Sequence, residues 1–499
     1  MKNLISLRGG ARIVAPLIFM CVLLTAANAQ VAPDAARIEA AEHWRALTRL
    51  DMEAAYALLR DNHPGMAPEI GDRDFVQRVE RAHLVALGRV SQVENYYGYR
   101  AVIAAFGNGV GDAHVGAGFG LTREYTVWPG FLTRSRGENF VVVRAPGDDG
   151  NVPPEGARLM ACDGIQASEF AQQRIGEYWA NWEVEAERSA QSWRLLVNDR
   201  NPFSPPPRTC VFETGNAEIE VVLEWRRSTY ETIFPVIQRA SPLAAAGYGV
   251  RRLANGAYWI SLEHLDAGAE QVIAAAQAAH RDLSAAPYVV VDVRGNGGGS
   301  SSYGDRLADI LLGQTLASSG GRQVSVWRAS QGNADAMHAF ADDVRTNRSD
   351  NNDLLDWANE TAEMLSSAVG AGQGLAPPLP RRTPPTPPFA DPAGGALERA
   401  RIFILTDYSC FSSCLLMVDT FKRRGAVQLG LPTAAATRYM ETRQVILPSG
   451  LAAFSTLQKV SLGSPDRLGP YIPAARYDGD IADTTALEHW VAQLVGSRR

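Results

Sequence analysis

Hydrophobic and polar positions change their period along this 499-residue chain. In residues 34–106, Ala and Leu recur at helical spacing through Ala36–Leu59 and Phe75–Leu87. A His-Pro-Gly break at 63–65 separates the two runs. The first part of the chain is therefore predicted to be helical.

Between about residues 121 and 230 the pattern shortens to runs typical of β-strands, divided by Gly, Pro and charged clusters. The predicted strands are Tyr125–Trp128, Asn139–Val143, Arg158–Cys162 and Glu218–Trp225. A segment rich in Trp and Glu, Ala167–Val197, interrupts them and is predicted to be a helical insert.

From residue 250 onward, apolar strand runs alternate with helical runs. The predicted strands are Ala257–Leu262, Tyr288–Val293, Arg401–Leu405 and Ala426–Leu429, and the predicted helices are Gly268–Ala285, Tyr303–Leu312 and Ser413–Arg423. This alternation favours an α/β fold with a largely parallel, covered sheet. The proline-rich stretch 376–395 cannot continue a helix or a central strand, and is either a lid or an inert spacer.

Residues 1–29 have the features of a signal peptide. Three basic residues precede an apolar run, Ile13–Ala27, and Ala27-Asn28-Ala29 offers a cleavage pattern. Because no other run reaches the roughly 18 apolar residues of a membrane helix, we expect a periplasmic or secreted protein with no membrane span. Removal of the signal changes the net charge from −6 to −9, which argues against a nucleic-acid partner.

Four cysteines remain after removal of the signal. In an oxidising compartment they permit two disulfides, and the local pairing is Cys162 with Cys210 and Cys410 with Cys414, although four cysteines allow three pairings. Metal binding is the alternative, but the chain has no CxxC pair and no His pair at zinc spacing. No metal or other cofactor is therefore expected.

The first of three segments with candidate chemistry ends a buried strand. Val289–Val293 runs into Arg294-Gly295-Asn296 and the triple glycine 297–299. Glycines there allow positive φ and point bare N–H groups into a cleft, where they could hold an oxyanion or a phosphate. The Walker pattern and the GxGxxG spacing that phosphate binding would need are both absent.

The second segment places Ser412 and Ser413 between a predicted strand and a predicted helix. There the helix dipole and free N–H groups favour a developing negative charge, so either serine is a candidate nucleophile. The structural alternative is a helix N-cap, the commonest role of serine at this position.

The third segment is a glycine-rich turn, 107–116, that presents His114. A lone loop histidine is usually a solvated surface residue. His114 is nevertheless the only one of the eight histidines in such a turn, and it is the candidate general base for a serine.

Taken together, the order and spacing of DVRGNGGG at 292–299, the serine turn about 115 residues later and the GDAH segment at 111–114 resemble the tail-specific (C-terminal processing) serine peptidases. His63-Pro64 resembles the "HP" entry segment of that family. The resemblance is nearer to its tricorn-like, histidine-using branch than to its Ser–Lys branch. It implies a ClpP/crotonase-like parallel-sheet core, with an N-terminal helical segment.

The resemblance also implies site residues. The nucleophile position falls on Ser412, with Ser413 as the competing register, and His114 falls on the base. The oxyanion donors would be the N–H of Ser413 and that of Gly298 or Gly299. The late acidic residue that orients the histidine falls on Asp478, with Asp480 as second choice, whereas Asp112 could simply cap its loop.

Two departures separate this chain from the Ser–Lys branch. Where that branch has its lysine, this chain has Thr437-Arg438, and arginine cannot be deprotonated to serve as a base. Lys422 lies about ten residues along the helix from the serine, roughly 15 Å away. The family's Ser-Glu glutamate is also absent, with Leu415 near its place.

Pro154–Ile165 is similar to a PDZ stretch, so the β-rich part is either a PDZ-like peptide-binding insert or a structural β module. The expected domains are 1–29 (signal peptide), 30–118 (helical region with the GDAH loop), 119–235 (PDZ-like) and 236–499 (catalytic α/β domain). The predicted function is a serine endopeptidase that acts on polypeptides by acyl transfer. The alternative is an inactive protein of the same fold that binds peptides or protein C-termini.

Overall fold

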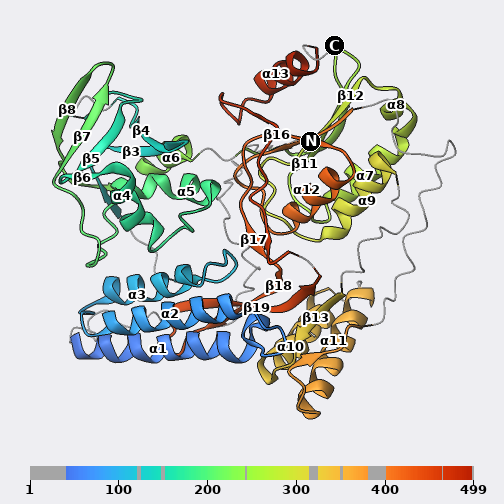
Figure 1. The fold of residues 1–499 in the computed structure, drawn as a ribbon, viewed down its shortest axis with the longest axis horizontal. Coiled ribbons are helices and arrows are strands. Elements are labelled where there is room, and N and C mark those ends of the chain that lie inside the picture. Colours follow the sequence, from blue (N-terminus) through green and yellow to red (C-terminus); the bar gives the residue numbers. More distant parts are fainter. Residues whose placement is uncertain are drawn as a thin grey trace, which may run out of the picture.

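The computed structural model describes residues 41–120, 125–147, 152–241, 244–313, 324–348, 352–379, 401–463 and 465–496. The predicted signal peptide and most of the predicted proline-rich loop lie outside the described residues. Among the residues described, no helix is both long enough and apolar enough to cross a membrane. Figure 1 shows three structural units of the chain: an α/β unit at the upper right, a β-rich unit at the upper left, and a row of helices over a sheet below.

The α/β assembly, which we call the parallel-sheet unit, is built on a six-stranded sheet in the order β10-β11-β12-β15-β16-β21. Only β10 and β11 pair antiparallel. The strands are β10 Tyr248–Arg252, β11 Tyr258–Leu262, β12 Tyr288–Asp292, β15 Arg401–Thr406, β16 Val427–Gly430 and β21 Ala475–Arg476. The predicted α/β class and its largely parallel sheet are confirmed.

Helices cover both faces of this sheet, which explains the continuous apolar runs of its central strands. Val289 and Val291 of β12 pack with the helices of one face, whereas Val290 packs with α13 on the other. The first face carries α7 Ala269–Ala278, α8 His280–Ala285, α9 Ser301–Leu312 and α12 Ser413–Arg423, and the second carries α13 Thr484–Gly496.

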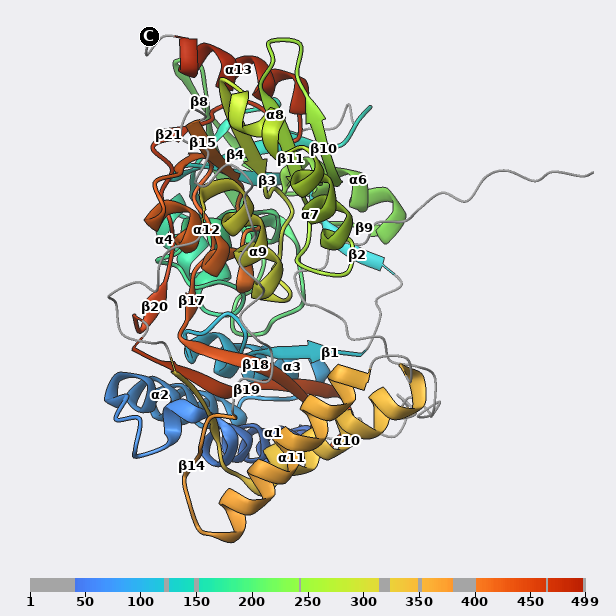
Figure 2. The same ribbon diagram turned by 90° about the vertical axis from the view of Figure 1, so that its right-hand side faces the viewer.

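The lower assembly, the helix–sheet unit, joins segments from both ends of the chain. Its helices are α1 Ala41–Asn62, α2 Arg73–Val90 and α3 Tyr96–Gly109, with a short 3₁₀ turn, η2 Pro64–Met66, at the predicted break. They pack on a five-stranded antiparallel sheet of β1 Ala117–Phe119, β13 Val324–Arg328, β14 Leu375–Ala376, β18 Tyr439–Ile446 and β19 Ala452–Leu462. Figure 2 shows the β18–β19 hairpin lying along these helices.

The expected catalytic domain 236–499 is therefore divided between two sheets. Phe454 and Leu457 of β19 share one core with Phe75 of α2 and Phe106 of α3. The apolar stripes of the three N-terminal helices need a covering layer, and the C-terminal hairpin supplies it. A helical hairpin, α10 Gln331–Asn347 and α11 Asn352–Gly370, packs beside β13 and was not predicted.

The β-rich unit contains the strands predicted between residues 121 and 230. Its sheet runs β3-β4-β5-β7-β8, with β6 paired to β5, and a separate ribbon joins β2 to β9. The strands are β2 Tyr125–Trp128, β3 Phe131–Arg136, β4 Asn139–Arg144, β5 Arg158–Cys162, β6 Ile165–Gln166, β7 Thr209–Thr214, β8 Ala217–Val222 and β9 Arg226–Thr229. The predicted helical insert is present as α4 Ala167–Ala171, η3 Gln172–Gly176, α5 Glu185–Gln191 and η4 Ser192–Leu196, and α6 Tyr230–Ala240 closes the unit.

A short two-stranded ribbon pairs β17 Ala436–Thr437 with β20 Arg467–Leu468. Figure 2 shows it between the parallel-sheet unit and the β18–β19 hairpin. Two disulfides join Cys162 to Cys210 and Cys410 to Cys414, as predicted. The first links adjacent strands of the β-rich unit, and the second brackets the serine turn.

Candidate active site

Ser412 lies at the junction between the turn that follows β15 and the helix α12, and its backbone is strained. The buried strand β15 leads into the turn 407–411, and α12 begins at Ser413. Ser412 has φ 55° and ψ −125°, a conformation that residues other than glycine rarely adopt. Its side chain makes no capping hydrogen bond, although it holds the N-cap position. The turn thus leaves the half-buried hydroxyl of Ser412 without a structural role as a cap.

The triple-glycine turn lies directly against this serine. A Cβ built on Gly298 would be 2.9 Å from the Cβ of Ser412 and 3.0 Å from the backbone N of Ser413. A Cβ on Gly299 would be 2.1 Å from the carbonyl oxygen of Leu265. Both glycines have positive φ, 108° and 128°. Only glycine therefore allows this close approach of the two turns.

The backbone N–H groups of the two turns differ in whether they have an acceptor. The N–H of Gly298 donates to the side-chain oxygen of Asn296 at 2.9 Å. Within the described part of the chain, the N–H groups of Gly299 and Ser413 have no acceptor, and that of Ser413 is one of the N–H groups that every helix start leaves unpaired. Of the two glycines predicted as oxyanion donors, Gly299 is therefore the one whose N–H remains available for an oxyanion.

Backbone and side-chain hydrogen bonds join the two turns. The N–H of Phe411 donates to the carbonyl of Asn296 at 3.3 Å. Asp407 accepts from the N–H of Gly295 at 3.1 Å and from the N–H of Ser409 at 3.0 Å. Burial raises the pKa of Asp407 to about 7, since the two N–H donors only partly offset the loss of solvation. This carboxyl group therefore links the turn that carries glycine donors to the turn that carries the serine.

His114 comes from the helix–sheet unit and reaches the serine turn from outside the parallel sheet. Its imidazole packs on the ring of Phe411, the residue before Ser412, with centroids 4.4 Å apart. Its side chain is 13% exposed. Ser455 of β19 holds the loop by donating to the carbonyl of His114 at 2.7 Å. The predicted base thus contacts the residue that precedes the predicted nucleophile in the chain.

The carboxylate beside His114 is Asp112. Its Oδ1 accepts from the N–H of His114 at 2.9 Å and lies 3.3 Å from Nδ1 of the imidazole. Its Oδ2 accepts a hydrogen bond from the hydroxyl of Thr437. Burial disfavours the ionised form of Asp112, but the bonds to His114 and Thr437 outweigh burial and hold its pKa below the usual range.

Asp478 has no comparable contact. Its side chain is 91% exposed, and its ion pair, at 3.9 Å, is with Arg476. Asp480, the second choice, accepts from the N–H of Ala482 at 3.0 Å. The loop after β21 lies at the edge of the sheet, so the resemblance that pointed to these residues does not describe how this chain holds its histidine.

Two other basic side chains are occupied elsewhere. Lys422, near the end of α12, donates to the side chain of Gln428 in β16 at 2.9 Å. His63 is fully buried against Phe75 and accepts from the N–H of Gly65 at 3.0 Å. Burial lowers the pKa of His63 to about 3, so it stays neutral at ordinary pH. His114, in contrast, contacts the serine turn through Phe411.

The β-rich unit also contacts the serine turn, through α5. Glu185 accepts from the hydroxyl of Tyr408 at 2.7 Å and from Arg476 at 2.6 and 3.1 Å. Ala186 packs in one apolar cluster with Tyr408 and Phe411. All three units therefore meet at residues 408–412.

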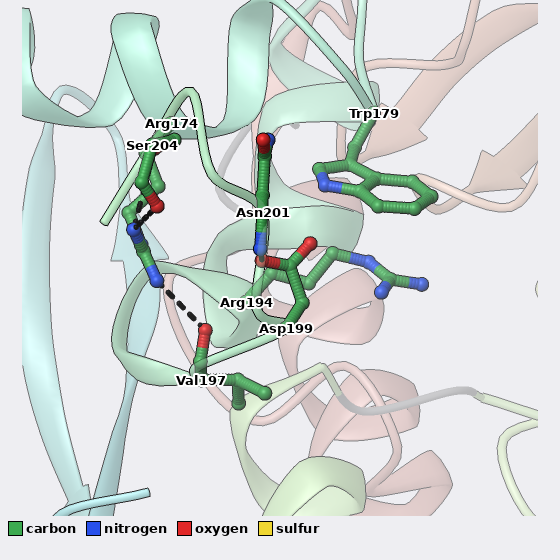
Figure 3. A pocket seen from close by; sticks show the side chains of 7 residues that line it. All are labelled: Arg174, Trp179, Arg194, Val197, Asp199, Asn201 and Ser204. Atoms are coloured by element: carbon green, nitrogen blue, oxygen red, sulfur yellow. Dashed lines mark hydrogen bonds between the residues drawn. The ribbon is translucent and has the colours of Figure 1, made fainter. Parts of the chain in front are cut away.

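A small cavity in the β-rich unit contains none of the candidate catalytic residues. Figure 3 shows the guanidinium of Arg174 directed at backbone oxygens, which it reaches at 2.8 Å for Val197 and 2.7 Å for Ser204. Arg194 lies 4.4 Å over the ring of Trp179 at the cavity wall. Arg174 thus joins the chain segments around the cavity by hydrogen bonds to their backbone oxygens.

No group of three or more His, Cys, Asp and Glu side chains suited to a metal ion occurs within the residues that the structure describes. Of the predicted site residues, Gly298 lies against Ser412 and Ser413, and His114 packs on the adjoining Phe411, whereas Asp478 lies elsewhere. Sequence reasoning missed the contacts that Asp112, Thr437 and Glu185 make here. The Asp-x-His spacing was a usable signal for the first, whereas nothing local marks the other two.

Comparison with known proteins supports the fold. No protein-family model matches the chain, and no curated protein matches it in sequence. The structure of mature CPAF is similar, with a TM-score of 0.58, 15% identity, and coverage of 91% of this chain and 98% of CPAF. Mature CPAF in complex with lactacystin gives a TM-score of 0.59 at 16% identity, covering 91% of this chain and 99% of CPAF. The chain thus has a fold similar to that of CPAF over almost its whole length.

A C-terminal processing protease is also among the similar structures. The photosystem II D1 C-terminal processing protease has 13% identity and a TM-score of 0.31, covering 88% of this chain and 94% of the protease.

Proposed function

We propose that this protein is an exported serine endopeptidase that hydrolyses peptide bonds through an acyl-enzyme on Ser412. The observation that carries the proposal is the convergence at the serine turn. A serine held at φ 55° meets bare glycine and helix-start amides on one side and the His114–Phe411 pair on the other. Strained backbone of this kind is concentrated at functional sites.

The proposed roles follow from the contacts. Because Asp112 occupies the Nδ1 side of His114, Nε2 is the nitrogen left to take the proton of the Ser412 hydroxyl. The serine oxygen then attacks the substrate carbonyl, and the resulting oxyanion accepts from the N–H groups of Gly299 and Ser413. The proton on Nε2 passes to the leaving amine, and water releases the acyl group by the reverse of the same steps.

Asp112 takes the orienting role that the resemblance had suggested for Asp478. A carboxylate on Nδ1 holds the imidazole in one tautomer and stabilises the imidazolium that forms during acylation. Asp112 suits this role because it is buried, ionised and bonded to both the backbone and the ring of His114.

Several features support the finer parts of the proposal. The signal-like residues 1–29 and two disulfides are compatible with export. The six-stranded sheet is proposed to be the ClpP/crotonase-like core that the sequence resemblance implies, and the β-rich unit is proposed to act as a PDZ-like insert that presents polypeptide to the serine. The structure of mature CPAF has been determined in complex with lactacystin, and the same compound is proposed as a ligand for the candidate site of this chain.

The test is labelling with a serine-directed fluorophosphonate. The wild-type protein should be labelled and should cleave an unstructured polypeptide such as casein, and Ser412→Ala should lose both activities. Ser409→Ala, a change in the same turn, is the matched control. Ser413→Ala keeps its backbone N–H and decides the register, since label retained on residue 412 in this variant excludes Ser413 as the nucleophile.

Two outcomes would contradict the proposal. If folded wild-type protein takes no label and cleaves no casein, the alternative of an inactive peptide-binding protein is favoured. If label appears but persists in Ser412→Ala, the nucleophile lies elsewhere.

A further inference from the structure

One hydrogen bond joins Thr437, in the segment that follows helix α12 and strand β16 in the chain, to the carboxylate of Asp112 beside His114. Thr437 lies in β17, where the chain leaves the parallel-sheet unit, and its hydroxyl bonds Oδ2 of Asp112 at the end of the α3 loop. The two residues are 325 positions apart in the sequence. This contact therefore depends on the tertiary fold alone.

The direction of the bond is determined by its surroundings. The Thr437 oxygen accepts from the N–H of Tyr439 at 3.3 Å, and the Asp112 side chain, fully buried, is an acceptor only when ionised. The hydroxyl proton of Thr437 therefore points to Asp112. Charge-assisted hydrogen bonds of this type are stronger than neutral ones and hold their partners more firmly.

The two oxygens of Asp112 have separate partners as a result. Oδ1 takes the backbone and ring of His114, and Oδ2 takes Thr437. Rotation of the Asp112 carboxylate would move Oδ1 away from His114 and Oδ2 away from Thr437, so the present hydrogen bonds hold it in one orientation. Thr437 thus determines which oxygen the imidazole meets, although it does not touch His114 itself.

We propose that Thr437 is a positioning residue that acts through Asp112, an inference that rests on the proposed function. By holding Oδ2, it keeps Oδ1 on Nδ1 of His114 and leaves Nε2 directed at Ser412. The residue stands where the Ser–Lys branch of the resembling family has its lysine. In this chain the same stretch supports a histidine base in place of supplying an amine base.

The first experiment compares Thr437→Val with Thr437→Ser. Valine keeps the shape of threonine and removes the hydroxyl, so kcat for casein and the rate of fluorophosphonate labelling should fall about tenfold or more, with KM unchanged. Serine restores the hydroxyl and should recover activity to within about threefold of wild type. Thr361→Val is the matched control, because the hydroxyl of Thr361 also donates a hydrogen bond, but to the carbonyl of Trp357 within α11.

The second experiment tests whether the effect passes through Asp112. Asp112→Asn and Thr437→Val are measured singly and together. If Thr437 acts only by orienting Asp112, adding Thr437→Val to Asp112→Asn should change kcat by less than about twofold. Effects that multiply would show that Thr437 contributes by another route and would overturn the inference.

Failure of this inference and failure of the proposed function are distinguishable. Labelled wild type together with a fully active Thr437→Val rejects the positioning role alone. Equal losses for the Val and Ser variants reject it as well, because a hydroxyl at this position would then be irrelevant. An unlabelled, inactive wild type overturns both proposals. Thermal unfolding of each variant identifies any loss that comes from misfolding.

Discussion

The two halves of the candidate site are held in different ways. The glycine turn follows β12 and the serine turn follows β15, and Asp292 and Leu405 of these neighbouring parallel strands are in register. The His114 loop belongs to another unit. It contacts the serine turn through the ring of Phe411, and it contacts β17 through the bond from Thr437 to Asp112. Backbone pairing thus fixes the nucleophile half, whereas side-chain contacts between units fix the base half.

The two halves of the site should therefore respond differently to substitutions. Adjacent strands of one sheet cannot shift without breaking several hydrogen bonds together. Contacts between separate units are fewer and can loosen individually. Changes to the nucleophile half should act by steric blockage or strain, and changes at the unit contacts should act by small displacements.

The largest effect is expected from Gly298→Ala. The added Cβ would lie 2.9 Å from the Cβ of Ser412 and 3.0 Å from the N of Ser413, so it disturbs the nucleophile and covers a proposed oxyanion donor. We expect kcat to fall by about 10²–10³-fold. Gly297→Ala is the matched control, because no atom lies within 4 Å of its Cβ position. Equal activity of the two variants would contradict the close apposition of the turns.

The second prediction concerns the pH dependence of stability through Asp407. Burial raises the pKa of Asp407 to about 7 in the folded protein, above its ordinary value of 3.8. Between these two pH values the native state therefore binds a proton that the unfolded state has lost. Stability contributed by this group should therefore fall as the pH rises from about 4 to 7, by at most roughly 4 kcal/mol.

This second prediction is checked by urea unfolding of the wild type and Asp407→Asn at pH 5 and pH 8. The variant removes the titration, so its free energy of unfolding should improve relative to wild type at the higher pH. Asp282→Asn, a change at an exposed carboxylate of α8, is the control. Parallel behaviour of Asp407→Asn and wild type would show that Asp407 does not titrate in this range.

The third prediction concerns the disulfide around the serine. Cys410 and Cys414 are fully buried and bracket Ser412, whose backbone conformation costs on the order of 1–3 kcal/mol. Replacing both cysteines by alanine should allow that conformation to relax and slow fluorophosphonate labelling about tenfold, equivalent to about 1.4 kcal/mol. The Cys162 and Cys210 pair, replaced in the same way, should leave the labelling rate much closer to wild type. An unchanged rate for the first pair would exclude a role in holding the turn.

The smallest effect is expected at the contact between the β-rich unit and the serine turn. Glu185→Gln retains the shape of the side chain but weakens its bonds to Tyr408 and Arg476. Since the Glu185 side chain is partly exposed, at 21%, we expect a loss of about 1 kcal/mol or less, seen as a several-fold rise in KM for casein. Glu183→Gln, an exposed neighbour, is the control. A change in kcat alone would place the effect in the turn and not in substrate binding.

Much of the fold was predictable because it is local. The serine helix was predicted with its observed bounds, Ser413–Arg423, and the strands at 125–128 and 158–162 were too. Their apolar periods and flanking turn residues are properties of the chain itself. The β18–β19 hairpin and the α10–α11 pair were missed, and so was their assignment to a second sheet with the N-terminal helices.

By itself, the sequence determined the strand–turn–helix around Ser412, the triple glycine after β12 and the presence of His114 in a glycine-rich turn, because each depends on a few neighbouring residues. The tertiary structure alone decided that Asp478 is exposed and pairs with Arg476, and that Thr437 donates to Asp112. The bond from Thr437 to Asp112 joins residues 325 positions apart. Such a contact depends on how whole units pack, which no local pattern encodes.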